Sequence, residues 1–459
     1  MKKSLIALAA LAAVGAASAQ SSVTLYGAVD IGYGSHKTET RNGSGSIKSS
    51  GVMDGANAGN RIGFRGTEDL GGGLKANFVV EQGISPTNGS LFGVRSGSAG
   101  HQIAGFSAAG VATQVDGSAG SYTVSTNRQS YLGLSNAAMG TVNIGYQYTA
   151  LYELATLSGY NVGSEGVPGA TKAHLHGQYI SGMGVRSNMI QYISPNFSGF
   201  TARLQYGAGA DREKFEAPGV IAGTNGVTLD KVRKGAVMLQ YANGPLSVAG
   251  AYTYARVQNS AGIDGVSVQQ PVFNVFGVQT AAAGATPLTG QERSGKLGQL
   301  GASYDFGVAK IAGTYNRGKN GGAANAPTAT SPVGTSGFES DYRAYQVGVA
   351  VPLGAFVPFA TYGRARTDSS NPAGVGPTAT AGATGRTEDY RQYQVGLRYS
   401  LSKRTTAYVF YGETRNDAAS LGGNGVAVVA ATATSPAGLG TGGTFYKDRK
   451  AIVGVQHSF

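Results

Sequence analysis

The chain has 459 residues and a formal net charge of +12, yet only 13% of its residues are charged, about half of the roughly 25% usual in soluble proteins. A mean hydropathy of −0.10 is too polar for a bundle of apolar transmembrane helices. The 74 glycines follow no Gly-X-Y period, which excludes collagen, and the absence of cysteine excludes disulfides and thiolate metal sites.

Residues 1–19 have the features of an export signal. Two lysines at positions 2 and 3 precede an apolar run over 5–17, which is shorter than the ~20 residues that a spanning helix needs. Ala17-Ser18-Ala19 then forms a cleavage site of the A-x-A type. We therefore expect a cleaved signal peptide over 1–19 and a single domain over 20–459. No later apolar run reaches the length of a transmembrane helix.

The rest of the chain alternates between apolar and polar residues with a period of two, which predicts β-strands with one apolar face. In the first of these segments Val23, Leu25 and Ile31 share one face and Thr24 and Asp30 share the other. Sixteen such strands are predicted, at 22–34, 58–67, 73–83, 127–135, 140–148, 187–194, 199–207, 235–242, 246–255, 296–306, 309–317, 342–351, 356–365, 390–400, 405–414 and 448–459.

The connections between these strands are short and long in strict alternation. The short ones are tight turns at 68–72, 136–139, 195–198, 243–245, 307–308, 352–354 and 401–404. The long ones run over 35–57, 84–126, 149–186, 208–234, 256–295, 318–341, 366–389 and 415–447. This organisation predicts an all-β fold, a 16-stranded antiparallel transmembrane β-barrel with short periplasmic turns and long extracellular loops.

A soluble β-sandwich or propeller is the alternative fold. Its outer strand faces would meet water and carry many charges, whereas the polar faces here carry mainly Gly, Gln, Asn and Thr. Aromatic residues also gather near strand ends, as at Tyr146, Tyr148, Tyr304 and Phe306, where the interfacial girdles of a membrane barrel lie. Both features favour the transmembrane barrel.

Basic side chains on the inward faces of the strands are the candidate functional residues, because a barrel of this size has an aqueous lumen whose lining determines selectivity. Alternation places six of them there: Arg61, Arg65, Lys75, Arg203, Lys310 and Arg398. The alternative is that they only pair with one another and with loop carbonyls. Lys403 and Arg404 lie in a tight turn and are expected to be solvated.

Other functional classes find little support in the sequence. His174 and His176 have no further His or Cys nearby, so no metal site is expected. Gly438, Gly440 and Gly443 match a dinucleotide fingerprint but precede no helix, so no cofactor is expected either. Dispersed basic residues do not favour nucleic acid as a partner. A barrel enzyme of the lipase or protease type, with no catalytic residues assigned, and a substrate-specific channel remain the alternatives.

Several segments along the chain match one family closely: 22–27, 60–76, 128–134, 191–200, 401–405 and 453–459. They resemble the general trimeric porins of β-proteobacteria, of the Burkholderia, Bordetella, Comamonas and Neisseria type. The resemblance implies a 16-stranded homotrimeric diffusion channel of the bacterial outer membrane that is not an enzyme. Phe459, at the end of an amphipathic strand, resembles the terminal signal read by the outer-membrane assembly machinery.

The resemblance also implies a constriction, formed by a third long loop that folds inward. Here this loop is 149–186, and its acidic residues Glu153 and Glu165 would face the basic wall. Tyr146 and Gln456 replace arginines that the family usually has. We expect a weak to moderate anion preference, with inorganic ions and small hydrophilic solutes passing through and with lipid and lipopolysaccharide around the barrel. The resemblance further suggests that the second long loop contacts a neighbouring subunit.

Overall fold

The structure is a computed structural model. It describes residues 22–40, 46–87, 105–106, 112–113, 127–156, 186–208, 231–258, 292–322, 339–370, 386–416 and 445–459. The expected signal peptide, residues 1–19, lies outside these ranges. Within them, none of the helical segments combines the length and the apolar character that a bilayer-crossing helix requires.

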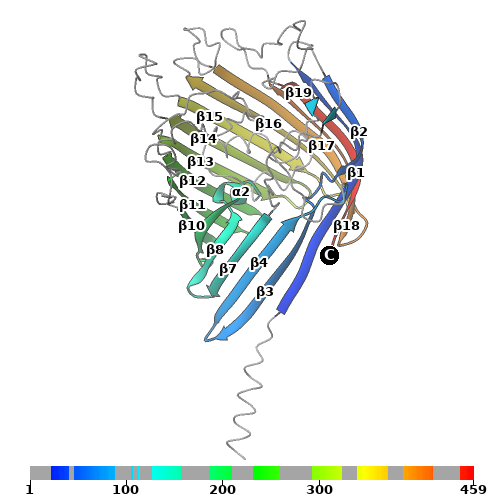
Figure 1. Ribbon diagram of the computed structural model, residues 1–459. Coiled ribbons are helices and arrows are strands. Elements are labelled where there is room, and N and C mark those ends of the chain that lie inside the picture. The colour runs from blue at the N-terminus through cyan, green and yellow to red at the C-terminus, as the bar shows by residue number, and fades with distance from the viewer. Residues whose placement is uncertain are drawn as a thin grey trace, which may run out of the picture.

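One large antiparallel sheet curls into a closed barrel (Figure 1). Its strands are β1 (Ser22–Thr40), β2 (Ser46–Asp54), β3 (Arg61–Gly71), β4 (Leu74–Gly83), β7 (Asn127–Asn136), β8 (Gly140–Tyr148), β9 (Arg186–Ile193), β10 (Phe200–Ala208), β11 (Lys231–Asn243), β12 (Leu246–Gln258), β13 (Glu292–Asp305), β14 (Lys310–Gly322), β15 (Glu339–Ala350), β16 (Phe356–Ser370), β17 (Arg386–Ser400), β18 (Thr405–Asn416) and β19 (Phe445–Ser458). A separate two-stranded sheet joins β5 (Gly105–Phe106) to β6 (Ala112–Thr113).

Strand β1 closes the barrel, because it pairs with β19 on one side and with both β2 and β3 on the other. β3 lies beside residues 22–28 of β1, and β2 lies beside residues 31–39. These two short strands therefore share one position in the ring, and the ring has the sixteen positions that the sequence predicts. Over the described ranges, closure leaves the large sheet without an edge whose N–H and C=O groups would meet lipid.

The first predicted boundary is wrong. The sequence predicted a strand that ends at residue 34 and a loop over 35–57, but β1 continues to Thr40 and β2 occupies most of that loop. Residues 35–40 are polar on both faces, so the apolar alternation stops while the backbone pairing continues. β14 and β16 likewise extend beyond their predicted ends at 317 and 365, because pairing continues past the last apolar residues.

All seven predicted tight turns connect antiparallel neighbours. The tightest are those after β3 and β11, each with two residues between the strands, where Gly72 and Gly244 adopt positive φ angles of 59° and 54°. A side chain at such an angle is strained, so glycine allows these strands to reverse within a few residues.

The distribution of polarity is the reverse of that in a soluble protein. On the outside, large apolar side chains are open, with exposed fractions of 64% for Leu132 and 62% for Leu300. On the inside, amides such as Gln205 and Gln394 are buried. An apolar exterior of this extent requires a hydrocarbon solvent, so the barrel is built to cross a bilayer.

We predict that Gly27→Val weakens barrel closure. A Cβ at position 27 would lie 2.4 Å from Cζ of Phe459 and 2.6 Å from the carbonyl oxygen of Arg61. Gly27 also exchanges both backbone hydrogen bonds with Phe459, at 3.1 and 3.2 Å. Overpacking here should cost about 1–3 kcal/mol, measured as a lower temperature for the heat-induced mobility shift of the folded barrel in gels. Ala451→Val, on the open outer face of β19, should leave that temperature unchanged; equal shifts for both variants would contradict the prediction.

Candidate functional site

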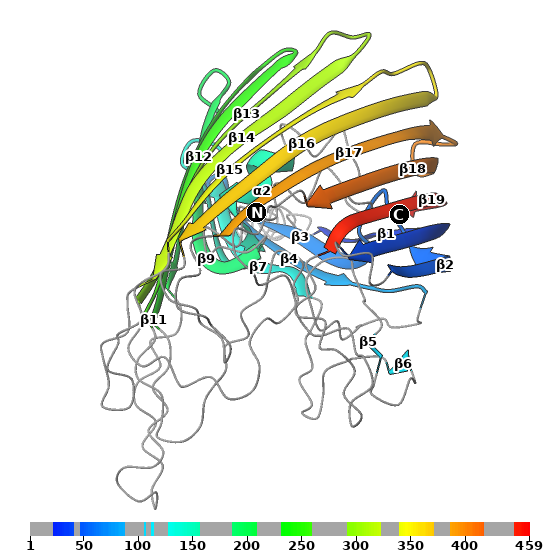
Figure 2. The ribbon, with the colours of Figure 1, turned by 90° about the horizontal axis from the view of Figure 1, so that it is seen from above.

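A short helix, α2 (Ala150–Ala155), lies on the concave side of the sheet (Figure 2). It begins the predicted third loop, 149–186, of which the structure describes residues 149–156 and Arg186, the first residue of β9. Ala150 and Leu154 pack against an apolar cluster on β11 and β12 that includes Met238 and Ala249. Leu151, which has no exposed surface, packs among Leu297, Tyr342, Ala344, Ala365 and Tyr390. The helix is thus fixed to the inner wall by its apolar residues.

The polar side of α2 carries one of the two predicted acidic residues of the loop. Oε2 of Glu153 lies 3.6 Å from a terminal guanidinium nitrogen of Arg203 on β10, and about a quarter of each side chain is exposed. The backbone N–H of Ala150 donates to Oε1 of Gln205 on the same strand at 2.8 Å. A loop carboxylate and a wall arginine therefore meet here. Glu165 lies outside the described residues, as do His174 and His176.

A second charged cluster forms around Glu81 on β4. Its carboxylate accepts hydrogen bonds from Nε of Arg128 at 2.5 Å and from the hydroxyl of Tyr26 at 3.1 Å, and it lies 3.7 Å from Nε of Arg61. Only 6% of the Glu81 side chain is exposed, against 32% of Arg61. One carboxylate thus neutralises only part of the positive charge of two arginines, and the Arg61 side chain stays partly exposed.

Sequence alternation did not place Arg128 or Arg186 in this lining. With Leu132 and Leu134 on the outer face of β7, a period of two puts Arg128 outside as well. The ladder between β4 and β7 shifts at Glu81/Gln82, and a bulge of this kind turns an extra residue to the other face. Arg128 and Arg186 both donate to the Tyr148 hydroxyl, at 2.9 and 3.1 Å, so they lie together. No apolar pattern signals such a bulge.

The other basic residues predicted for the wall are spread along the barrel. The guanidinium of Arg65 lies over the ring of Tyr26, 5.1 Å from its centre. Lys75 and Lys310 lie at the starts of β4 and β14, next to the short turns. These three residues therefore do not join the Glu81 cluster as ion-pair partners in the part of the chain that the structure describes.

Residues 55–60, which connect β2 to β3, form a second segment bound to the wall. The buried carboxylate of Asp30 accepts the backbone N–H groups of Asn57 and Ala58 at 2.8 and 2.7 Å, and the hydroxyl of Tyr408 at 2.6 Å. The backbone N–H of Asp30 in turn donates to Oδ1 of Asn60. These bonds satisfy backbone groups that the interrupted strand position leaves without ladder partners.

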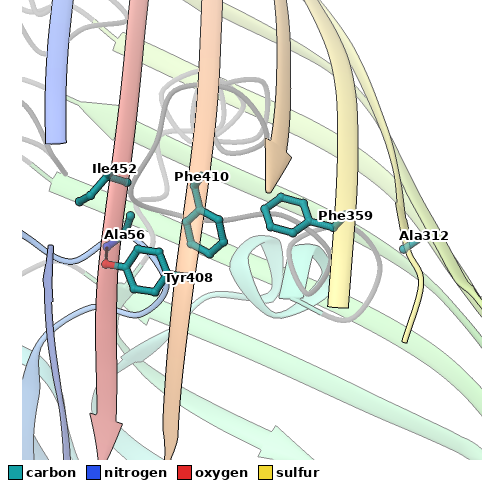
Figure 3. Packing of buried hydrophobic residues seen from close by; sticks show 6 residues of the cluster. All are labelled: Ala56, Ala312, Phe359, Tyr408, Phe410 and Ile452. Atoms are coloured by element: carbon teal, nitrogen blue, oxygen red, sulfur yellow. Dashed lines mark hydrogen bonds between the residues drawn. The ribbon is translucent and has the colours of Figure 1, made fainter. Parts of the chain in front are cut away.

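Apolar packing holds the same segment. Ala56 packs in a buried cluster with side chains from β14, β16, β18 and β19: Ala312, Phe359, Tyr408, Phe410 and Ile452 (Figure 3). The backbone N–H of Ala56 donates to the Tyr408 hydroxyl at 3.0 Å. Segment 55–60 therefore covers an aromatic part of the wall.

Arg398 lies at this segment. Its Nε donates to Oδ1 of Asn57 at 2.7 Å, and its guanidinium lies 4.4 Å from the ring centre of Phe359 and 5.2 Å from that of Phe410. Oε1 of Gln456 accepts from the Asn57 amide at 2.5 Å. Arg398 thus anchors segment 55–60, a contact that alternation alone could not reveal.

A closed barrel that is apolar outside and lined by amides, arginines and carboxylates inside is a membrane channel. The description "Gram-negative porin" belongs to the family model that matches residues 6–419. The chain therefore belongs to the Gram-negative porin family, and it is a porin of the outer membrane. Within the described ranges, no group of three or more His, Asp or Glu side chains could hold a metal ion.

Two similar curated proteins are outer membrane porins. One, from Bordetella pertussis, is 29% identical over 91% of this chain and 95% of its own length. Another, outer membrane porin protein 32 of Delftia acidovorans, is 31% identical over 70% of each chain. Among solved structures, an anion-selective porin from Comamonas acidovorans matches with a TM-score of 0.54 at 21% identity, covering 96% of this chain and all of that one, which shows a shared fold.

We predict that Asp30→Asn loosens segment 55–60. An amide at position 30 would present donors to the N–H groups of Asn57 and Ala58, so at least one buried hydrogen bond would be lost at a cost of about 1–3 kcal/mol. We expect larger fluctuations of single-channel current and a lower unfolding temperature. Asp69→Asn is the control, because Asp69 also accepts a backbone N–H but in an exposed turn. Quiet, wild-type-like currents in the Asp30 variant would contradict this prediction.

Proposed function

We propose that this porin is a passive, water-filled channel with a weak to moderate anion preference for ions and small hydrophilic solutes. The observation that carries the proposal is the unequal charge of the lining: Arg61 and Arg128 share the single carboxylate of Glu81, and Arg186 adds a further cation beside Tyr148. The pair formed by Arg203 and Glu153 is neutral overall. Anions therefore meet a net positive wall.

Charges of this kind modulate flux rather than bind solutes tightly. Two unit charges about 10 Å apart in a wet pore interact by about 0.4 kcal/mol at the dielectric constant of water and about 1.7 kcal/mol at an effective value near 20. Interactions of that size change the ratio of ion permeabilities by a factor of about 2 to 20.

Reversal potentials in a planar bilayer under a KCl gradient test the proposal. The wild type should prefer chloride, and Arg61→Glu or Arg203→Glu should shift the reversal potential toward potassium by removing a positive wall charge. Lys403→Glu makes the same charge change in an exposed turn and should shift it much less. A potassium preference of the wild type would overturn the anion assignment, and unchanged potentials in both arginine variants would show that these side chains do not line the narrow part.

We further propose that the channel is a homotrimer, exported with cleavage after Ala19 and inserted by the assembly machinery through the strand that ends in Phe459. One solved structure of the same fold, an outer membrane protein of Vibrio cholerae, is described as a trimer form. Lipopolysaccharide and phospholipid would then surround the trimer.

Single-channel recordings at low protein concentration test the trimer. Insertion of one particle should raise the conductance in a single step, and strong voltage should close the channel in three equal steps. Cross-linking of the same sample should give a trimer band. Single-step closure together with a monomer band would refute the assignment.

A further inference from the structure

The outer face of the barrel has a groove across β11 to β14, on the surface that faces the membrane. Its volume is about 470 Å³. The groove is lined by Val237, Leu239, Gly250, Ala251, Tyr252, Gly298, Gln299, Leu300, Tyr315 and Arg317. Apart from the arginine at one end, its outward-pointing side chains are apolar or aromatic.

The floor of the groove contains two glycines at positions where the surrounding atoms leave room for a side chain. A Cβ at Gly298 would have its nearest neighbour at 3.8 Å, and one at Gly250 at 3.4 Å. By contrast, a Cβ at Gly63 would lie 2.6 Å from the ring of Tyr26. Glycine in a strand interior costs stability and adds no packing. The open space at 250 and 298 is therefore available to a molecule outside the chain.

Cations gather at the upper end of the groove, on the side of the long connections. Arg317 lies opposite Gly298 on one side and opposite Arg343 on the other, and Lys296 lies opposite Lys319 in the next row. Like charges directly opposite across a ladder are destabilising. The nearby carboxylates neutralise only part of this positive charge. Asp341 lies 4.0 Å from Lys319, and Asp368 lies 3.3 Å from Arg343.

The row of like charges continues along the sheet. Arg343 lies opposite Arg366 on β16, and Asp368 also pairs with Arg366 at 3.0 Å. The Asp368 carboxylate therefore forms ion pairs with two arginines. Within the described residues, Lys296 and Arg317 form no ion pair. Among the described residues, the upper end of the groove thus carries more cations than carboxylates, which suits an anion with more than one negative group.

We propose that this groove binds lipid A, the phosphorylated glycolipid of the outer leaflet. One acyl chain lies over Gly250 and Gly298, between Leu300 and the tyrosines, while the phosphates contact Lys296, Arg317 and Lys319. The apolar groove and the cationic end follow each other along the membrane normal, as the chain and headgroup of a lipid do. The proposal rests on the proposed function, in which lipopolysaccharide surrounds the barrel, and it identifies where on the barrel this lipid binds.

Binding of two purified lipids to the intact porin in detergent tests the assignment, with bound lipid per protomer counted by native mass spectrometry. The probes are bisphosphorylated lipid A and the same lipid with its phosphates removed. The wild type should bind the phosphorylated form at least about tenfold more tightly, since each cation near an anionic headgroup contributes favourably to the binding free energy. Lys296→Gln with Arg317→Gln should abolish that difference, and Gly298→Leu should weaken binding of both lipids.

Matched controls separate the site from general effects. Lys403→Gln removes a cation from the opposite end of the barrel, and Ala451→Val adds bulk to the outer face of β19; both should bind lipid A like the wild type. Conductance and reversal potential should stay unchanged in the groove variants, because their side chains point away from the lumen. A failure of the lipid assignment therefore leaves the channel proposal standing, and the reverse also holds.

Three results would overturn the proposal. Equal wild-type affinity for the two lipids would remove the role of phosphate. Equal competition by phosphatidylglycerol would assign the groove to anionic phospholipid rather than lipid A. Because the chain has no native cysteine, Gly298→Cys also gives a single reporter, and a disulfide-linked dimer formed through it would assign the groove to a second copy of the chain.

Discussion

Hydrogen bonding of the backbone within the membrane is the constraint on which this structure depends. Hydrocarbon offers no partners to N–H and C=O groups, so a sheet can cross a bilayer only when its first and last strands meet. Here that meeting is the pairing of β1 with β19, which continues from Ala28 opposite Ser458 to Thr40 opposite Phe445. Gly27 and Phe459 extend it by two further backbone hydrogen bonds.

The same constraint governs the elements bound inside the barrel. α2 and segment 55–60 leave the ladder, so their backbone groups need partners of another kind. Gln205 accepts an N–H at the start of α2, and Asp30 accepts two from segment 55–60. Each non-strand element is therefore held by a polar side chain on the wall and by apolar packing beside it. Glu153 on α2 and Arg398 beside segment 55–60 are thereby held against the wall.

Much of this fold follows from the sequence, because lipid and water on opposite faces impose a strict period of two. Strand positions, tight turns and the inward faces of Arg61 and Arg203 are predictable in this way. Arg128 is not, because a bulge reverses its face, and Glu81 gains its role from a neighbour 47 positions along the chain. β2 escaped prediction because its apolar residues, Ile47, Val52 and Met53, do not alternate with polar residues along the strand. The role of Arg398 depends on segment 55–60, whose position no periodicity describes.

The contacts of segment 55–60 bear on the order in which the barrel can be completed. The segment belongs to the first seventh of the chain, yet Tyr408, Arg398 and Gln456, which help to hold it, belong to the last three strands. A growing sheet that still lacks those strands offers this segment the Asp30 carboxylate, but not the contacts of Tyr408, Arg398 and Gln456. The final shape of the lumen is thus set in the last step of folding, and an incompletely closed barrel cannot yet have the lining of the finished pore.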